Sequence, residues 1–184
     1  AFANCQSLRR VTFEKNSLLK IIESHAFFEC TNLEEINFED ADFLKDIGDN
    51  AFQYSGLKQI NFSKQSDLTR IGEFAFSSCK NLKKVKIEGQ HYTYHMSDTE
   101  LSIKSFAFYK SPIEELIIEN VGSIYDYAFA QTSLRNVKLP VSLNYLGSYV
   151  FYDCTLDSIE IPRNINYIPS GLIRNNKNLR ITLT

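Results

Sequence analysis

The stretch from Ile71 to Ile87, IGEFAFSSCKNLKKVKI, returns in altered copies along the whole chain. Each copy is marked by an Ala-Phe dipeptide or a close variant of it. The copies lie at Ala1-Phe2, Ala26-Phe27, Ala51-Phe52, Ala75-Phe76, Ala107-Phe108, Ala128-Phe129, Val150-Phe151 and Leu172-Ile173. Successive copies are 25, 25, 24, 32, 21, 22 and 22 residues apart. Such a period is typical of a solenoid, in which stacked units bury a core that no single unit can form.

Apolar residues flank each Phe slot in a fixed pattern. One lies five positions before the slot, and a leucine-like residue with an alternating apolar pair lies after it, as in Leu82, Val85 and Ile87. The alternation predicts a short strand with one buried and one solvated face. We expect the first such strand at residues 10–14, and each strand should pair in parallel with that of the next unit.

We predict a single domain over residues 1–184, built of about eight units. Their bounds are 1–20 (partial), 21–46, 47–70, 71–102, 103–123, 124–145, 146–167 and 168–184 (partial). The unit 71–102 is the longest, because EGQHYTYHMSDTELS follows its strand. We expect a projecting loop at residues 89–102, since long loops in compact repeats often carry function.

The composition is that of a folded chain with no strong charge bias. Of 184 residues, 43% are hydrophobic and 23% are charged, and the formal net charge is -2. This balance gives no overall attraction to nucleic acid or to an anionic membrane. The longest apolar runs are only a few residues, too short to insert directly into a membrane.

The repeated pattern IxxxAFxxCxxLxxVxI resembles the BspA-type leucine-rich repeat, in its Treponema-like subclass, over essentially the whole chain. The resemblance implies an α/β solenoid. It would be a right-handed superhelix with a parallel β-sheet on the concave face and short helices or turns on the convex face. It also implies a cell-surface or secreted protein of bacteria or mucosal protozoa that adheres to host proteins. Only Leu139-Pro140 and Ile161-Pro162 approach the Ile-Pro strand ending that is common in the family.

Four cysteines share one repeat position, three residues after the Phe slot. They are Cys5, Cys30, Cys79 and Cys154, and other units place Ser55, Ser111, Thr132 or Asn176 there. The slot therefore favours a small side chain, and we predict buried free thiols. Stacked equivalent residues have poor geometry for a disulfide, although a Cys5–Cys30 bridge is the main alternative.

The long loop contains His91 and His95, with Asp98 and Glu100 nearby. A helix would bring the two imidazoles to one face for a divalent metal, but the loop carries little helix signal. We therefore predict a solvated recognition loop and no cofactor. His25 is expected at the surface or in packing.

Two further columns of equivalent residues have open interpretations. Aromatic residues two positions before the Phe slot, Phe74, Phe106, Tyr127 and Tyr149, form either a packing ladder or an exposed partner site. The residues after each strand, Glu14, Glu39, Ser63, Glu88 and Glu119, form either a solvated edge or an acidic rim for a basic partner or a cation. We favour the ladder and the solvated edge.

Protein-binding residues are predicted on the solvated strand face and in the long loop. They are Arg10, Glu35, Asn37, Gln59, Asn61, Lys84, Lys86, Glu115, Ile117 and Lys138 on the strands, and His91, Tyr92, Tyr94 and His95 in the loop. This mixed lining suits a protein ligand, whereas nucleic acid would need a basic stripe. Asn61-Phe62-Ser63 is a glycosylation sequon, but its place in a strand makes glycosylation unexpected.

The sequence indicates no enzyme. The seven glycines are scattered, and no His-carboxylate-nucleophile set gathers near one loop. The leading hypothesis is a protein-binding array that acts as a surface adhesin on host or extracellular matrix proteins. The alternative is a cytoplasmic scaffold for protein–protein interactions, since free thiols without a disulfide framework fit a reducing compartment.

Overall fold

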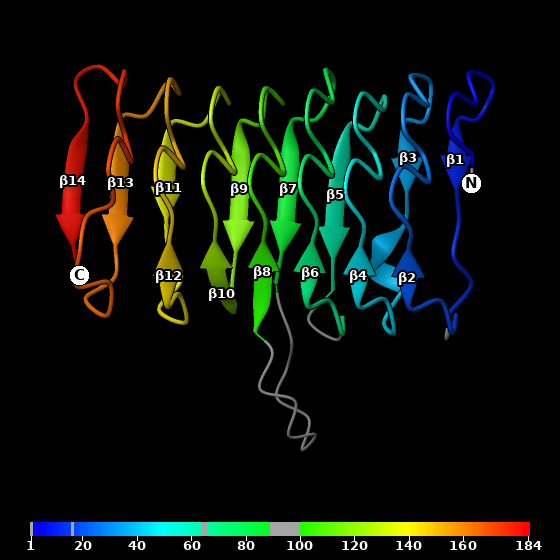
Figure 1. The fold of residues 1–184 in the computed structure, drawn as a ribbon, viewed down its shortest axis with the longest axis horizontal. Helices are drawn as coiled ribbons and strands as arrows, with labels where there is room; N and C mark the ends of the chain where they lie inside the picture. Colours follow the sequence, from blue (N-terminus) through cyan, green and yellow to red (C-terminus); the bar gives the residue numbers. More distant parts are fainter. Residues whose placement is uncertain (1, 16, 64–65, 89–99) are drawn as a thin grey trace.

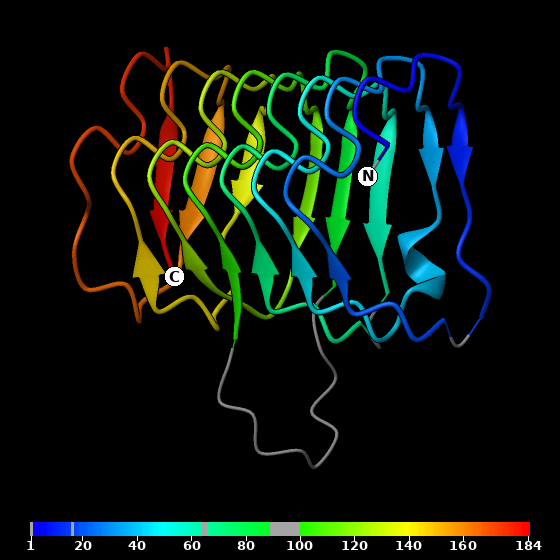
Figure 2. The same cartoon turned by 45° about the vertical axis from the view of Figure 1, so that its right-hand side comes forward.

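The computed structural model describes residues 2–15, 17–63, 66–88 and 100–184. It is a parallel-sheet β-solenoid of about seven turns. Figures 1 and 2 show two rows of short strands that run in opposite directions, with turns joining the rows at both ends of the strands. Residues 91, 92, 94, 95 and 98, on which the loop predictions depend, lie outside the described residues.

The first row contains the predicted strands. Its members are β1 (Arg10–Val11), β3 (Glu35–Ile36), β5 (Gln59–Phe62), β7 (Lys84–Ile87), β9 (Glu115–Ile118), β11 (Asn136–Lys138), β13 (Ser158–Ile161) and β14 (Arg180–Leu183). All of its pairs are parallel, as predicted, but they form three sheets: β1-β3, β5-β7-β9 and β11-β13-β14. The 3-10 helix η1 (Phe38–Asp40) follows β3 closely. β3 is therefore only two residues long, and it does not pair with β5.

The second row is one continuous six-stranded sheet that the sequence pattern did not reveal. It contains β2 (Ile21–Ile22), β4 (Asp46–Ile47), β6 (Arg70–Ile71), β8 (Leu101–Ile103), β10 (Val121–Ile124) and β12 (Tyr145–Leu146). Of the short helices or turns expected opposite the first row, the helices are therefore wrong. This sheet and turns occupy that side, and η1 is the only helix in the described part of the chain.

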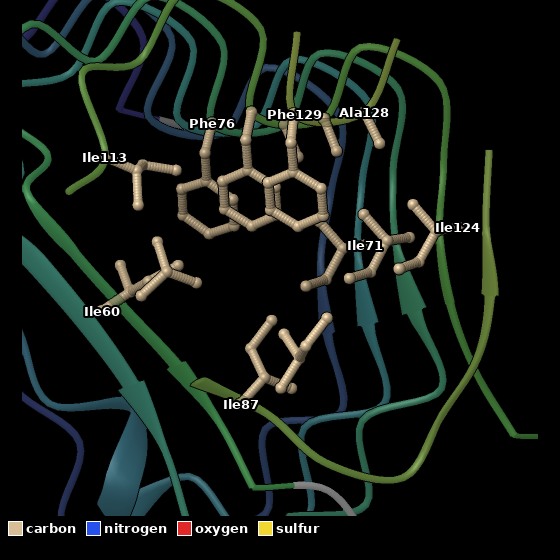
Figure 3. Close-up of a cluster of buried hydrophobic side chains, with 14 of the residues drawn as sticks. Ile60, Ile71, Phe76, Ile87, Ile113, Ile124, Ala128 and Phe129 are labelled. Atoms are coloured by element: carbon tan, nitrogen blue, oxygen red, sulfur yellow. The ribbon is translucent and has the colours of Figure 1, made fainter. Parts of the chain in front are cut away.

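The core lies between the two rows of strands. Phe27, Phe52, Phe76, Phe108, Phe129 and Phe151 stack face to face, with ring centroids 5.0–5.8 Å apart. Figure 3 shows the rings of Phe76 and Phe129 in line, with Ile60 on one side and Ile71 and Ile124 on the other. Because equivalent residues from successive coils touch, each coil covers the apolar surface of its neighbour.

Backbone hydrogen bonds join the coils at the Phe turns as well. Phe52 N donates to Ala75 O at 2.8 Å, and Phe76 N donates to Ala107 O at 2.7 Å. The residues two before and two after the Phe slot have positive φ, as in Phe74 (54°) and Ser78 (56°). These left-handed residues reverse the chain direction and let successive turns stack in register.

The six-stranded sheet ends at β12, where a side chain takes the place of the next strand. Tyr167 Oη accepts a hydrogen bond from Leu146 N at 3.1 Å and donates one to Leu146 O at 3.0 Å. The adjoining Ile168 is 59% exposed, whereas its repeat equivalents, such as Ile124 and Leu146, are buried. No seventh strand forms here to carry Ile168 into the core.

We expect Tyr167→Phe to lower the free energy of unfolding by about 1–2 kcal/mol, because the substitution leaves the Leu146 backbone groups without this partner. Urea unfolding followed by circular dichroism measures the loss. Tyr152→Phe is the matched control, because the Tyr152 hydroxyl only accepts an exposed bond from Asn175. Equal effects of the two substitutions would contradict a capping role for Tyr167.

Candidate protein-binding surface

The outward face of β5, β7 and β9 carries a shallow hollow of about 150 Å³. Side chains alternate along each strand, and the parallel register places Gln59 beside Lys84 and Lys84 beside Glu115. The lining consists of Gln59, Ile60, Asn61, Lys84, Val85, Lys86, Glu115 and Ile117. Six of these residues were predicted to bind protein, and the structure brings those six together. Ile60 and Val85 also border the hollow, but both are buried core residues, as expected.

Asn61 has the most unusual polar group in this hollow. Its Oδ1 is buried and has no hydrogen-bond partner among the described residues. A buried acceptor without a donor costs about 1–3 kcal/mol. The equivalent residue one coil earlier, Asn37, has no such deficit, because its Oδ1 accepts from Phe13 N at 2.7 Å and its Nδ2 donates to Phe13 O at 3.0 Å. Because this oxygen is also closed to solvent, a donor reaches it only when the side chains around the hollow move aside.

The charges around the hollow are paired within the protein. Lys84 Nζ lies 3.0 Å from Glu115 Oε2, and Lys86 Nζ lies 2.9 Å from Glu88 Oε2. Such exposed pairs contribute about 0–1 kcal/mol, so a partner with its own charges can replace them at little cost. Ile117 adds an apolar contact, since 38% of it is exposed.

The remaining predicted residues lie away from this hollow. Arg10 and Glu35 form an ion pair at 2.6 Å on the β1-β3 sheet, and Lys138 pairs with Glu160 at 3.4 Å on the β11-β13-β14 sheet. The side-chain amide of Asn37 is already hydrogen-bonded to the backbone of Phe13, so it is not available to a partner. The loop residues His91, Tyr92, Tyr94 and His95 are outside the described residues, and their role stays a prediction.

The cysteines that share one repeat position form thiol hydrogen bonds to backbone carbonyls. All four thiols are free, and Cys30, Cys79 and Cys154 are buried. Cys79 Sγ donates to Phe52 O at 3.1 Å, and Cys154 Sγ donates to Phe129 O at 3.2 Å. Burial raises the pKa of Cys79 to about 11, so this thiol stays protonated and keeps its donor at neutral pH. At Cys30, Cys79, Ser111 and Cys154 the slot thus holds a small side chain that donates to the Phe carbonyl of the preceding coil.

The aromatic column forms the packing ladder that was favoured. The rings of Phe74, Phe106, Tyr127 and Tyr149 stack at 4.8–4.9 Å with interplanar angles of 2–4°. All four are half-buried. The ladder ends on Gly171 (φ 61°), where an added Cβ would lie 2.2 Å from Tyr149 Cε1. Gly171 therefore leaves room for the last ring.

The acidic column is spread along the strand ends. Glu14, Glu39 and Glu119 are exposed, and Glu88 is half-buried beside Lys86. Within residues 2–15, 17–63, 66–88 and 100–184, no group of three or more His, Cys, Asp or Glu side chains is placed to hold a metal ion. In the same ranges, no helix has the length and apolar character needed to cross a membrane.

Solved structures share this fold. A leucine-rich repeat protein of T. pallidum matches 96% of the chain at 20% identity and a TM-score of 0.63, over 69% of its own length. A leucine-rich repeat protein of Bacteroides ovatus matches the whole chain at 24% identity and a TM-score of 0.53. The chain spans 57% of that protein's length. The pneumococcal vaccine antigen PcpA matches 88% at 26% identity and a TM-score of 0.51, over 32% of its length.

Comparison with protein families agrees with the repeat pattern. No curated protein matches the chain. The model of the BspA type leucine rich repeat region matches residues 1–99 and 101–183 in six copies. This match confirms the resemblance drawn from the Ala-Phe pattern. The chain belongs to the BspA-type leucine-rich repeat family.

Proposed function

We propose that this chain binds a protein partner through the outward face of β5, β7 and β9. The observation that carries the proposal is the unpartnered Asn61 Oδ1 in the hollow on that face. When the side chains around the hollow move aside on binding, a donor from the partner, such as an amide or guanidinium N–H, reaches this acceptor and removes the cost of its burial. Lys84, Glu115 and Ile117 surround it with charged and apolar contacts.

The size of the hollow favours a protein over a small molecule. Small-molecule sites enclose about 300–1,000 Å³, whereas this hollow of about 150 Å³ accommodates one projecting side chain. A protein interface combines such a pocket with a wider polar rim. The strand residues outside the hollow, including Arg10 and Lys138, supply this rim in the proposal.

The proposed partner is a host cell-surface or extracellular matrix protein, and the proposed role is adhesion at the cell surface. Membership of the family and the likeness to a pneumococcal vaccine antigen support this role. A cytoplasmic scaffold is the second candidate, and the four free cysteines favour it. The proposed activity is binding without catalysis in both cases.

Charge reversal at Lys84 and Lys86 tests the surface. We expect Lys84→Glu with Lys86→Glu to weaken binding to immobilised fibronectin, laminin or collagen about tenfold or more, because like charges then crowd around Glu88 and Glu115. Surface plasmon resonance with each purified matrix protein measures the change.

The matched control is Lys110→Glu with Lys177→Glu, which reverses two exposed charges outside the strands, the hollow and its rim. It should reduce binding by less than about threefold. A second variant, Asn61→Leu, removes the unpartnered acceptor and should also weaken binding. If the Lys84/Lys86 double variant and Asn61→Leu both bind as the unaltered chain does, with circular dichroism showing an intact fold, the proposed binding surface is wrong.

A further inference from the structure

The turns that follow the Phe stack differ in length by one residue. Two residues separate Cys30 from Leu33 and Cys79 from Leu82, but only Gly56 separates Ser55 from Leu57. All three leucines are fully buried, so the difference in length appears at the surface. The turn at Gly56 is the one short turn in the sequence that has a long turn on both sides.

This difference produces a notch between the two longer turns. The notch has a volume of about 410 Å³ and is lined by Glu29, Thr31, Tyr54, Ser55, Gly56, Ser78, Lys80 and Asn81. Gly56 forms the floor of the notch. Its N donates to Cys30 O at 3.2 Å, which holds this turn against the preceding coil. An added Cβ at Gly56 would lie 2.3 Å from Thr31 O, so only glycine fits this close approach.

One wall of the notch is an exposed aromatic ring. Tyr54 is 42% exposed, and Phe28 packs edge-on against it with the ring centroids 5.9 Å apart. This contact fixes the orientation of the tyrosine before any ligand binds. A fixed, half-exposed ring offers an apolar face at low cost in side-chain entropy.

The rest of the lining is polar and carries opposite charges. Glu29 and Lys80 form no ion pair with another described residue, and the Asn81 amide has only a long bond of 3.4 Å to Gly56 O. The carboxylate accepts, the ammonium donates and the amide does both. A neutral ligand with many hydroxyl groups satisfies all three, because each hydroxyl both donates and accepts.

We propose that this notch binds one or two neutral sugar residues of a glycan. The apolar C–H face of a sugar ring lies on Tyr54, and its hydroxyls bond to Glu29, Lys80 and Asn81. The volume lies within the range of about 300–1,000 Å³ typical of small-molecule sites. The site lies on the turns, whereas the proposed protein-binding surface lies on the strands, so either can fail without the other.

The test uses a panel of neutral sugars, namely galactose, mannose, N-acetylglucosamine and lactose. In ¹H–¹⁵N spectra of the labelled chain, at least one sugar should shift the amides of Tyr54, Gly56 and Lys80, with a Kd on the order of 1 mM. Tyr54→Ala should weaken that binding about tenfold or more. Tyr109→Ala is the matched control, because Tyr109 contacts Phe106 on a turn outside the notch, and it should leave the Kd unchanged.

A second variant closes the notch without removing a lining side chain. An Asn inserted between Gly56 and Leu57 restores the length of the neighbouring turns, and it should abolish the sugar-dependent shifts while the circular dichroism spectrum is unchanged. The proposal is overturned if no sugar shifts these amides, or if the folded insertion variant still binds. Glucuronic acid is added to the panel as an acidic sugar, and shifts caused only by it, or only by a matrix protein at this notch, would also overturn the proposal.

Discussion

We expect Phe76→Ala to lower the free energy of unfolding by about 3–5 kcal/mol, because it removes a fully buried ring and leaves a cavity. Phe76 stacks between Phe52 at 5.1 Å and Phe108 at 5.4 Å, and it also meets Phe38 edge-on at 6.3 Å. The cavity therefore interrupts the stack at its middle and weakens the contacts on both sides. Urea unfolding monitored by circular dichroism measures the effect.

Phe2→Ala is the control for this prediction. Phe2 occupies the same repeat slot, but it is 56% exposed and stacks on only one ring, Phe27, at 5.4 Å. Its loss should cost about 1 kcal/mol or less. If the two substitutions destabilise the chain equally, burial of the ring between two neighbouring coils is not what stabilises the stack.

The sequence predicts the Phe stack well because the physical requirement repeats. Each coil needs a large apolar side chain at the slot of Phe76, so the Ala-Phe pattern recurs at nearly constant spacing. The second row of strands left only one apolar residue, five positions before each Phe slot, as its signal. Arg70–Ile71 and Asp46–Ile47 are two-residue strands with one inward residue each, and one apolar residue cannot display alternation.

The sequence also did not predict the positive φ angles of the turns, because residue types that rarely adopt such angles occupy these positions. Phe74, Phe106 and Tyr127 all have positive φ, a region where bulky side chains are uncommon. Only His25, Asn50 and Gly171, in the same column, are residue types that favour this conformation. The aromatic residues adopt it because stacking against the neighbouring coil offsets the strain.

The candidate surface was predictable in outline but not in detail. The repeat register alone places Gln59, Lys84 and Glu115 side by side, as the β5-β7-β9 sheet does. The repeat could not distinguish Asn37 from Asn61, which occupy equivalent positions. Asn37 bonds to the Phe13 backbone, whereas Asn61 Oδ1 has no partner in the part of the chain that the structure describes.

The second large effect on stability is expected at the repeat position three residues after the Phe slot, where side chains donate hydrogen bonds to backbone carbonyls of the Phe turns. Ser111 Oγ donates to Phe76 O at 2.6 Å and accepts from Cys79 N at 3.0 Å, and the side chain is fully buried. Ser111→Ala leaves both backbone groups without this partner. Each such group costs about 1–3 kcal/mol, so we expect the free energy of unfolding to fall by about 2–6 kcal/mol.

Ser111→Cys separates the hydrogen bond from simple packing. A thiol keeps a donor for Phe76 O, as Cys79 Sγ does for Phe52 O in the equivalent slot. We therefore expect the cysteine variant to lose only about 1 kcal/mol, because sulfur is the weaker partner. Urea unfolding gives both values, and hydrogen exchange at the Cys79 amide should accelerate more in the alanine variant. Equal losses in the two variants would mean that the slot selects size alone, and that the thiol–carbonyl bonds do not stabilise the turns.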